Sequence, residues 1–340
     1  MSGKVLQQIQ PVVERQMPRV PESSKMVTVF GGSGFIGRHL VGSLAERGYR
    51  IRIACRRPDL AGYLQPLGNV GQIHAVQANL RYRSSVDRAV QGAYAVVNLV
   101  GILYETGGQK FAAVQDFGAR AVAEAARSVG ARLVHGSAIG ADSDSDSVYA
   151  RTKAAGENAV LETLPDAVIT RPSILFGPED HFFNRFANMA RFSPALPLIG
   201  GGKTRFQPVY VCDVAEAMAL AVDGKARSGT IYELGGPAIL TFRECMERML
   251  EITERKRLLI DIPFPVASME ARFLELLPKP LLTVDQVKQL ARDNVVSEAA
   301  IRENRTLRGL DIKPHSIGAI LPSYLWRYRK MGQYSPNKFA

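Results

Sequence analysis

The stretch that most constrains the fold is residues 27–37, with the sequence VTVFGGSGFIG. Its β-branched and aromatic start predicts a strand buried on both faces, as in a parallel sheet. Gly31, Gly34 and Gly37 then form a G-x-x-G-x-x-G turn, and a helix pattern follows to about residue 47. Such a turn lets a pyrophosphate rest on backbone amides at the positive end of a helix. The turn residues predicted to contact a dinucleotide are Gly31, Ser33, Gly34, Phe35, Ile36 and Gly37.

Further strand-like runs at 50–55, 72–77, 95–101 and 132–136 alternate with helix-like runs at 84–92 and 111–129. This alternation predicts an α/β fold with a Rossmann-type doubly wound parallel sheet. We expect three regions along the chain. They are an extended N-terminal arm over 1–25, a nucleotide-binding Rossmann domain over 26–230, and a smaller, mostly helical C-terminal region over 231–340, with interleaved strand and helices and a basic, aromatic tail.

The end of the second strand run predicts which nicotinamide nucleotide is bound. Sites that prefer NAD have an acidic residue there to take the ribose 2′-hydroxyl, whereas this chain has Arg56 and Arg57. Guanidinium groups can clamp a 2′-phosphate, so we predict NADP(H) as cofactor. A merely solvated basic strand end would leave the choice open. Other residues predicted to contact the cofactor are Asn79, Leu80, Val100, Gly101, Tyr149, Lys153, Pro172 and Ile174.

A possible catalytic constellation follows the fifth strand run. Ser137 ends that run, and Tyr149 and Lys153 form a Tyr-x-x-x-Lys pair on one face of a helix. In this chemistry the ammonium lowers the phenol pKa and holds the nicotinamide ribose, the phenol acts as acid or base, and the serine binds the substrate oxygen. We therefore predict Ser137, Tyr149 and Lys153 as a triad facing the cofactor. His135 is expected to be structural, and Asp213 to cap a helix over 215–222.

The composition limits the partners. A net charge of +11 would suit a phosphorylated ligand, an anionic membrane surface, an acidic protein or nucleic acid as partner, or it would serve solubility alone. Nucleic acid is not predicted, because no RNA-binding aromatic signature or dense basic block is present. The longest apolar stretch, over 93–104, is too short for a membrane span. The three cysteines have no metal-ligand spacing, so no metal site is predicted.

Several longer stretches resemble one family. The sequence is similar to the short-chain-dehydrogenase-like accessory subunit of respiratory complex I, the alpha subcomplex subunit nine family, in the extended or atypical branch of that superfamily. The resemblance covers residues 27–321, with its more specific stretches at 98–106, 176–187, 203–211 and 282–287. It implies a tightly held NADPH with a structural role, in a subunit on the peripheral arm near the quinone site and the membrane, outside the electron path. Mitochondrial members tend to lack the Tyr of Tyr-x-x-x-Lys, so its presence here leaves a vestigial or a working triad open.

Two functions are therefore expected as alternatives. The first is a non-catalytic NADPH-binding accessory subunit of a bacterial complex I, peripheral on the cytoplasmic face of the inner membrane, or on the mitochondrial matrix side in a eukaryote. Its partners would be peripheral-arm and membrane-interface subunits, reached through the N-terminal arm and the C-terminal region. The second is a free NADP-dependent reductase, epimerase or dehydratase acting on a quinone precursor, a lipid or a nucleotide sugar. The turn expected over 260–265 and the tail over 324–330 would serve contacts in the first reading, or form a packed lid otherwise.

Overall fold

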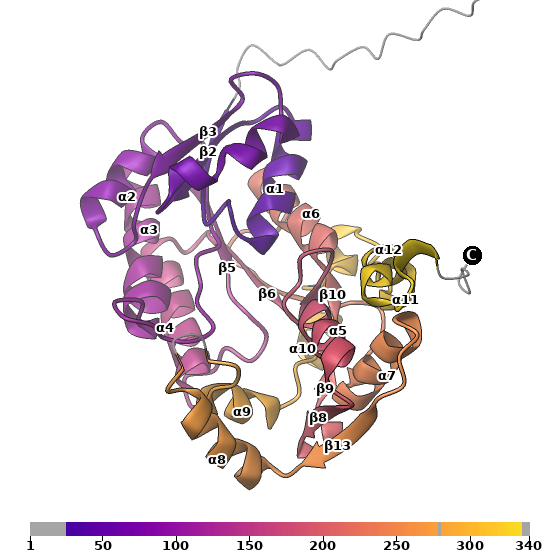
Figure 1. Ribbon diagram of the computed structural model, residues 1–340. Coiled ribbons are helices and arrows are strands. Elements are labelled where there is room, and N and C mark those ends of the chain that lie inside the picture. Colours follow the sequence, from indigo (N-terminus) through magenta and orange to yellow (C-terminus); the bar gives the residue numbers. More distant parts are fainter. Residues whose placement is uncertain (1–24, 278–279, 335–340) are drawn as a thin grey trace, which may run out of the picture.

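A computed structural model describes residues 25–277 and 280–334 (Figure 1). Its main sheet has seven parallel strands in the order β11-β6-β5-β4-β1-β2-β3. The strands are β1 (Met26–Phe30), β2 (Arg50–Cys55), β3 (Ile73–Gln77), β4 (Ala95–Asn98), β5 (Arg132–Gly136), β6 (Val168–Pro172) and β11 (Ile231–Leu234). The strand order reverses beside β1, which places a ligand crevice at the carboxyl end of that strand. The predicted doubly wound α/β fold is confirmed.

Helices cover both faces of this sheet, as the strands' nearly continuous apolar sequences require. One face carries α1 (Phe35–Glu46) and α6 (Val211–Val222), which pack together over a core centred on β1 and β2. The other carries α2 (Arg83–Val90), α3 (Phe117–Ser128) and α4 (Val148–Thr163), packed through an alanine-rich core. Figure 1 shows these two layers on opposite sides of the sheet. The helix predicted over 111–129 begins with a π-helical turn over Ala112–Asp116 before α3.

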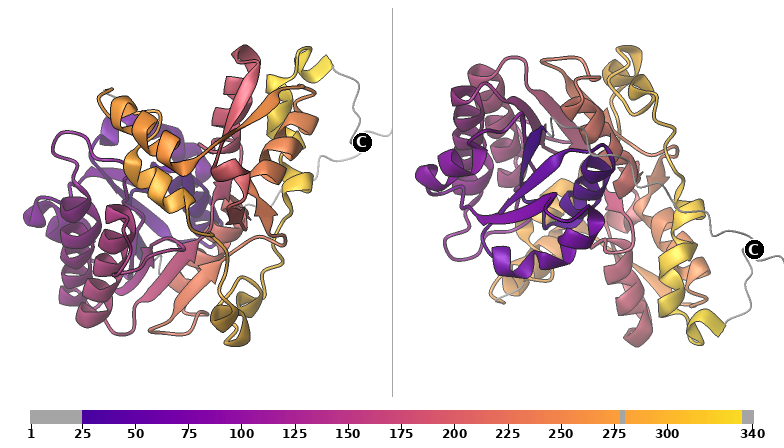
Figure 2. Two further views of the ribbon diagram at one scale, coloured as in Figure 1. Left: turned by 90° about the horizontal axis from the view of Figure 1, so that it is seen from below. Right: turned by 90° about the horizontal axis from the view of Figure 1, so that it is seen from above.

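A second lobe packs beside the carboxyl ends of the sheet strands and is drawn in red to yellow in Figure 2. Its strands form three two-stranded pairs, β7 (Leu175–Phe176) with β10 (Val209–Tyr210), β9 (Arg205–Phe206) with β12 (Leu240–Thr241), and β8 (Ala195–Ile199) with β13 (Leu258–Ile262). Its helices are α5 (Phe183–Phe192), α7 (Phe242–Ile252), α8 (Phe264–Leu274), α9 (Val284–Leu290), α10 (Glu298–Arg302), α11 (Ile317–Ile320) and α12 (Pro322–Leu325).

Two local expectations are wrong in the second lobe and at its junction with the main sheet. The predicted turn over 260–265 is wrong at its start, because Leu258–Ile262 pairs in parallel with β8 as β13. Asp213 does not cap a helix: α6 begins at Val211, and the Asp213 carboxylate accepts hydrogen bonds from the backbone N–H and the Nδ1 of His315. In the tail over 324–330, Tyr324 and Leu325 are buried beside α5 and α7, whereas Trp326 is exposed, so both alternatives for the tail stay open.

The predicted boundary between the Rossmann domain and the C-terminal region, at residue 230, falls immediately before β11, and β11 lies in the main sheet beside β6. Residues 175–210, which belong to the predicted Rossmann domain, lie in the second lobe. A division of the chain by packing therefore differs from a division by residue number. The N-terminal arm, apart from Lys25, lies outside the described residues. Within the described part, no helix is both long and apolar enough to cross a bilayer.

Candidate functional site

The glycine turn forms a cradle between β1 and α1. Gly31 has a φ of +77°, and a Cβ there would lie 3.2 Å from the carbonyl carbon of Leu99. At Gly37 a Cβ would come within 2.4 Å of the Gly31 oxygen, so the helix can sit against the turn only with glycine. Gly34 is the N-cap of α1, and the first turn of that helix contains no acidic residue. The cradle therefore fits an anionic pyrophosphate at the helix N-terminus.

At the adenosine side of the cradle, Arg56 and Arg57 are exposed at the end of β2, as the sequence predicts. Arg57 is held by a bidentate pair with Asp59, with Nη2 2.7 Å from Oδ2. A 2′-phosphate would therefore have to compete with this carboxylate for Arg57. The Asn79 side chain accepts a hydrogen bond from the Arg81 backbone N–H at 3.2 Å, so part of its hydrogen-bonding capacity is used locally.

Two residues that sequence reasoning missed lie beside this end of the cradle. The Tyr63 hydroxyl donates to the Ser33 carbonyl at 2.8 Å, and the Arg38 guanidinium lies 5.4 Å from the Tyr63 ring centroid. The Arg38 Nε is buried and has no hydrogen-bond partner among the described residues. Arg38 stands in the first turn of α1, four residues after Gly34, and that position could have been recognised as a second cationic candidate.

The nicotinamide side brings the predicted triad together. Ser137 follows β5, and α4 presents Tyr149 and Lys153 toward it, with the Lys153 Nζ 5.9 Å from the Tyr149 ring centroid. Lys153 is buried and donates to the Gly136 carbonyl at 3.2 Å. The Ser137 hydroxyl is also buried, and it has no hydrogen-bond partner among the described residues. A buried polar atom left unpaired in this way marks a place for a ligand atom.

These three residues border a cleft of about 550 Å³ that also reaches the glycine turn. The predicted residues that line it are Gly31, Gly34, Phe35, Ile36, Gly37, Gly101, Ser137, Tyr149, Lys153, Pro172 and Ile174. The predicted residues that lie outside its lining are Ser33, Arg56, Arg57, Asn79, Leu80 and Val100. The latter group stands at or just after the carboxyl ends of β1 to β4, and Leu80 is buried. Their contact with a cofactor stays a prediction.

Burial decides the protonation of Tyr149 and Lys153. Burial, reinforced by the Asp285 carboxylate, raises the pKa of Tyr149 to about 12. The lowering of this pKa by the Lys153 ammonium stays a prediction. Burial lowers the pKa of Lys153 to about 8, against a smaller opposing effect of Glu157. Tyr149 is therefore a protonated phenol near neutral pH, ready to donate a proton to a substrate oxygen. A nicotinamide bound alongside would supply the hydride for such a reduction.

Asp285, on α9, is the most consequential residue that sequence reasoning missed. Its carboxylate accepts hydrogen bonds from the Val148 N–H at 2.7 Å, the Tyr149 N–H at 3.3 Å and the Ser147 hydroxyl at 2.8 Å. It therefore caps the helix that carries Tyr149 and Lys153, from 137 residues further along the chain. The pair Thr283 and Gln286 forms a capping box that signals the start of α9, but nothing local indicates which helix Asp285 reaches.

Asn294, in the segment that follows α9, is also tied to the cleft. Its side-chain amide donates to the Ile139 carbonyl at 3.1 Å and accepts from the Ser173 hydroxyl at 2.7 Å. Arg292 forms an ion pair with Asp142 at 2.9 Å. Residues 285–294 thus form a strap that joins the second lobe to α4 and to the loops after β5 and β6. In Figure 1 α9 lies directly below α4.

Two other sequence features need no functional account. His135 is buried in the sheet, where its Nδ1 lies 3.3 Å from the Asn98 Nδ2 and burial lowers its pKa to about 3. It is therefore a neutral structural imidazole. Among the described residues, no group of three or more His, Cys, Asp or Glu side chains is placed to hold a metal ion.

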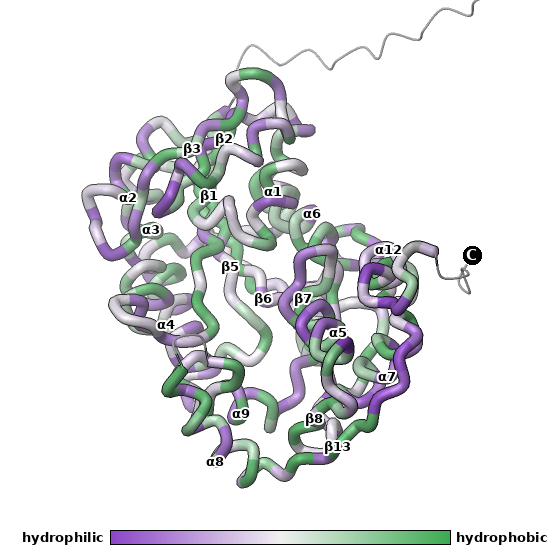
Figure 3. Tube along the Cα trace, in the orientation of Figure 1, coloured by the Kyte–Doolittle hydropathy of each residue, from purple (hydrophilic) through white to green (hydrophobic). Residues whose placement is uncertain are grey.

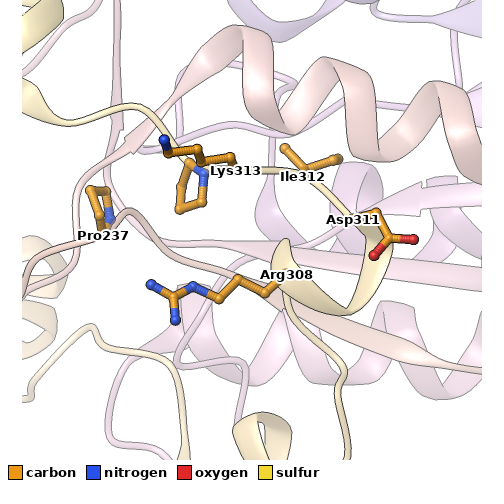
Figure 4. Close-up of a pocket in the computed structure, with 6 residues that line it drawn as sticks. Pro237, Arg308, Asp311, Ile312 and Lys313 are labelled. Carbon is orange, nitrogen blue, oxygen red and sulfur yellow. The ribbon is translucent and has the colours of Figure 1, made fainter.

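A second hollow, of about 360 Å³, lies away from this chemistry (Figure 4). Arg308 and Lys313 extend toward Pro237, and the Asp311 carboxylate points away from them. None of the glycine-turn or triad residues lines it. It is a shallow surface feature with no buried unpaired side chain, and the cleft at Tyr149 remains the candidate site.

Comparison with known proteins agrees with this geometry. The model of the NAD dependent epimerase/dehydratase family matches residues 27–235. NADH dehydrogenase (ubiquinone) 1 alpha subcomplex subunit 9 of Arabidopsis thaliana is 35% identical over 323 residues, 91% of this chain and 79% of that protein. A ceramide reductase of Caulobacter vibrioides is 35% identical over 190 residues, 56% and 58% of the two chains. A dTDP-glucose 4,6-dehydratase from Streptomyces venezuelae, solved with NAD and TYD, superposes with a TM-score of 0.68 at 21% identity, over 92% and 99% of the chains.

Proposed function

The chain belongs to the NAD dependent epimerase/dehydratase family and to the alpha subcomplex subunit 9 family within it, and on that premise we propose that it is an accessory subunit of respiratory complex I. In this role it would hold NADP(H) without taking part in electron transfer. The observation that carries this proposal is the 35% identity to the Arabidopsis subunit over nearly the whole chain, second lobe included. The bound cofactor would then hold the sheet and the second lobe together, because residues of both line the cleft.

The proposal also assigns a place to the subunit. It would dock on the peripheral arm near the quinone site, against the membrane-interface subunits, on the cytoplasmic face of a bacterial inner membrane or on the matrix side in a mitochondrion. The net charge of +11 would favour an acidic partner surface or anionic lipid headgroups there.

The cofactor is proposed to be NADP(H) because Arg56 and Arg57 stand where an NAD site has a carboxylate. We expect Arg56→Asp with Arg57→Asn to weaken NADPH binding by at least tenfold more than NADH binding, measured by calorimetric titration. Asp59→Asn should have the opposite effect on NADPH alone, because it releases Arg57 from its bidentate pair. Equal losses for the two nucleotides would overturn this assignment of the 2′-phosphate site.

A free NADP-dependent reductase is the second candidate. It is favoured by one specific observation, namely that Ser137, Tyr149 and Lys153 are all present and border one cleft. The partial match to the Caulobacter ceramide reductase is compatible with that reading. In this case Tyr149 would donate the proton and Ser137 would bind the substrate oxygen, while Lys153 held the ribose.

One experiment separates the two candidates. Detergent-solubilised membranes from the source organism would be resolved on a native gel and analysed by mass spectrometry. Co-migration of this chain with NADH:quinone oxidoreductase activity is the result expected for an accessory subunit. Migration as a free protein, together with NADPH oxidation that Tyr149→Phe abolishes, would overturn it in favour of the reductase.

A further inference from the structure

We propose that the outer half of the cleft, beyond Tyr149 and Ser137, binds an uncharged and largely apolar molecule that presents a single carbonyl or hydroxyl oxygen to those two side chains. The inference rests on the proposed function only in assigning the inner half of the cleft, beside the glycine turn, to a nicotinamide nucleotide. The class of this second ligand would be the same for a working reductase and for a non-catalytic accessory subunit.

Apolar side chains form much of the lining of the outer half, with the polar side chains of Ser173, His181, Gln289 and Asn294 among them. The apolar ones are Ile102, Leu103, Ile139, Ile174, Leu175 and Phe182. These side chains come from four separate places: the connection after β4, the loop after β5, the β6–β7 junction and the segment before α5. Apolar surface contributed by both lobes surrounds the position that a substrate would occupy next to Tyr149, and burial of an apolar ligand there would be favourable.

Charged groups are scarce in the same space. Among the described residues that line the cleft, Lys153 is the one Lys, Arg, Asp or Glu, and it is buried against the Gly136 carbonyl, while the imidazole of His181 is exposed. The nearby Arg171 does not line the cleft, and its guanidinium is paired with Glu157. A nucleotide sugar would bring a diphosphate that needs guanidinium or ammonium partners. The outer half offers none, which argues against that class of ligand.

Three of the polar side chains around the outer half, Asn294, Ser173 and Gln289, are engaged in hydrogen bonds. The Asn294 amide bonds Ile139 and Ser173, and the Gln289 Nε2 donates to Asp285 at 2.9 Å. Among the described residues that line the cleft, the Ser137 hydroxyl is the buried side-chain polar atom without a hydrogen-bond partner, and Tyr149 lines the same cleft. His181 also lines the cleft, but it is exposed. The buried free hydrogen-bonding capacity is therefore concentrated at Ser137. It matches a ligand with one oxygen on a hydrocarbon body rather than a sugar with several hydroxyls.

The test is a calorimetric titration of the full chain with heptyl methyl ketone, with nonane as the matched hydrocarbon and UDP-glucose as the charged competitor. Each titration is run with and without saturating NADP⁺, which cannot deliver a hydride, so that binding is measured apart from turnover. We expect the ketone to bind about tenfold more tightly than nonane and UDP-glucose not to bind. Binding of UDP-glucose as tight as that of the ketone would overturn the inference.

Two variants locate the site. Ser137→Ala should weaken ketone binding by about tenfold through the lost hydrogen bond, and Leu103→Asp should weaken it through an exposed charge at the rim. Ile301→Asp, an equally exposed position on α10, is the control and should leave binding unchanged. Unchanged affinity in both cleft variants would place the ketone elsewhere and refute the proposal. Failure of NADP⁺ itself to bind would count against the cofactor assignment, while the ketone titration without nucleotide would still decide this inference.

Discussion

Two glycines of α1 differ in what a methyl group would meet. A Cβ at Gly37 would lie within 2.4 Å of the Gly31 oxygen, whereas a Cβ at Gly42 would have no heavy atom within 4 Å. We expect Gly37→Ala to abolish nucleotide binding and to lower the free energy of unfolding by about 2 kcal/mol or more, because backbone must move to accept it. Gly42→Ala should instead raise stability by roughly 0.5–1 kcal/mol, because alanine is the better helix former.

Urea unfolding and NADPH titration of the two variants provide the measurement. The pair is matched in residue type, helix and substitution, so a difference between them isolates the close approach of helix and turn. Equal loss of nucleotide binding in both variants would contradict this account of the cradle.

Lys153 is a buried ammonium whose removal should stabilise the protein while impairing the site. Burial lowers its pKa from 10.5 to about 8, so between these two values the unfolded chain binds more protons and stability rises with pH. At pH 7 the full cost of burying the charge is present, about 3 kcal/mol at most. We expect Lys153→Met to raise the free energy of unfolding at pH 7 by about 2 kcal/mol, after the loss of its hydrogen bond to Gly136.

The pH dependence distinguishes this effect from better packing. Urea unfolding at pH 7 and at pH 10.5 should show the advantage of the Met variant shrinking toward zero at the higher pH, where the parent lysine is neutral. NADPH affinity should fall in the variant at pH 7. An advantage that does not change with pH would mean that packing, rather than charge burial, is its source.

At the scale of elements, α4 depends on a cap supplied by α9. We expect Asp285→Asn to lower the free energy of unfolding by about 1–2 kcal/mol and to weaken NADPH binding, because one charged acceptor serves three donors of the first turn of α4. Asp142→Asn is the control, since it breaks only the exposed ion pair of the same strap with Arg292 and should cost at most about 0.5 kcal/mol. Equal effects of the two changes on NADPH affinity would show that α9 does not position α4.

How far the sequence predicts these elements depends on how local their determinants are. The β1-turn-α1 unit and the shared face of Tyr149 and Lys153 follow from spacing within a few residues, and both are found as expected. The pairing of β13 with β8, the reach of Asp285 and the binding of His315 by Asp213 join segments far apart in the chain. Neither periodicity nor capping propensity specifies such partners, which is why those features were missed or assigned wrongly.

At the scale of the whole molecule, exposed apolar side chains gather on α8 and on β13 in the part of the chain that the structure describes. On α8 the side chains of Val266, Met269 and Phe273 recur on one face and are exposed, while Ala267 and Ala271 are buried on the other. Leu258 and Ile260 of the neighbouring strand β13 are exposed as well. Figure 3 shows these hydrophobic stretches at the lower end of the second lobe. An apolar face of this kind in a cationic protein suits the docking role proposed above.

A charge on this face tests that role. We expect Phe273→Asp to reduce co-migration with complex I on native gels at least tenfold, because it places a carboxylate in a desolvated contact. Thermal stability and NADPH affinity should stay unchanged, since the side chain is 69% exposed. Ile239→Asp, an exposed site in the loop before β12, is the control and should co-migrate as the parent does. Full co-migration of the Phe273 variant would remove α8 from the docking surface.

The hydrogen bonds that Asp285 accepts from α4 can form only late in the synthesis of the chain. During synthesis, the helix that holds Tyr149 emerges from the ribosome 137 residues ahead of the carboxylate that caps it. At 5–20 residues per second that interval is about 7–27 s. The nascent sheet therefore lacks this cap, and its crevice stays open on one side, until Asp285 has been synthesised. Binding of the proposed cofactor is accordingly expected only after that point.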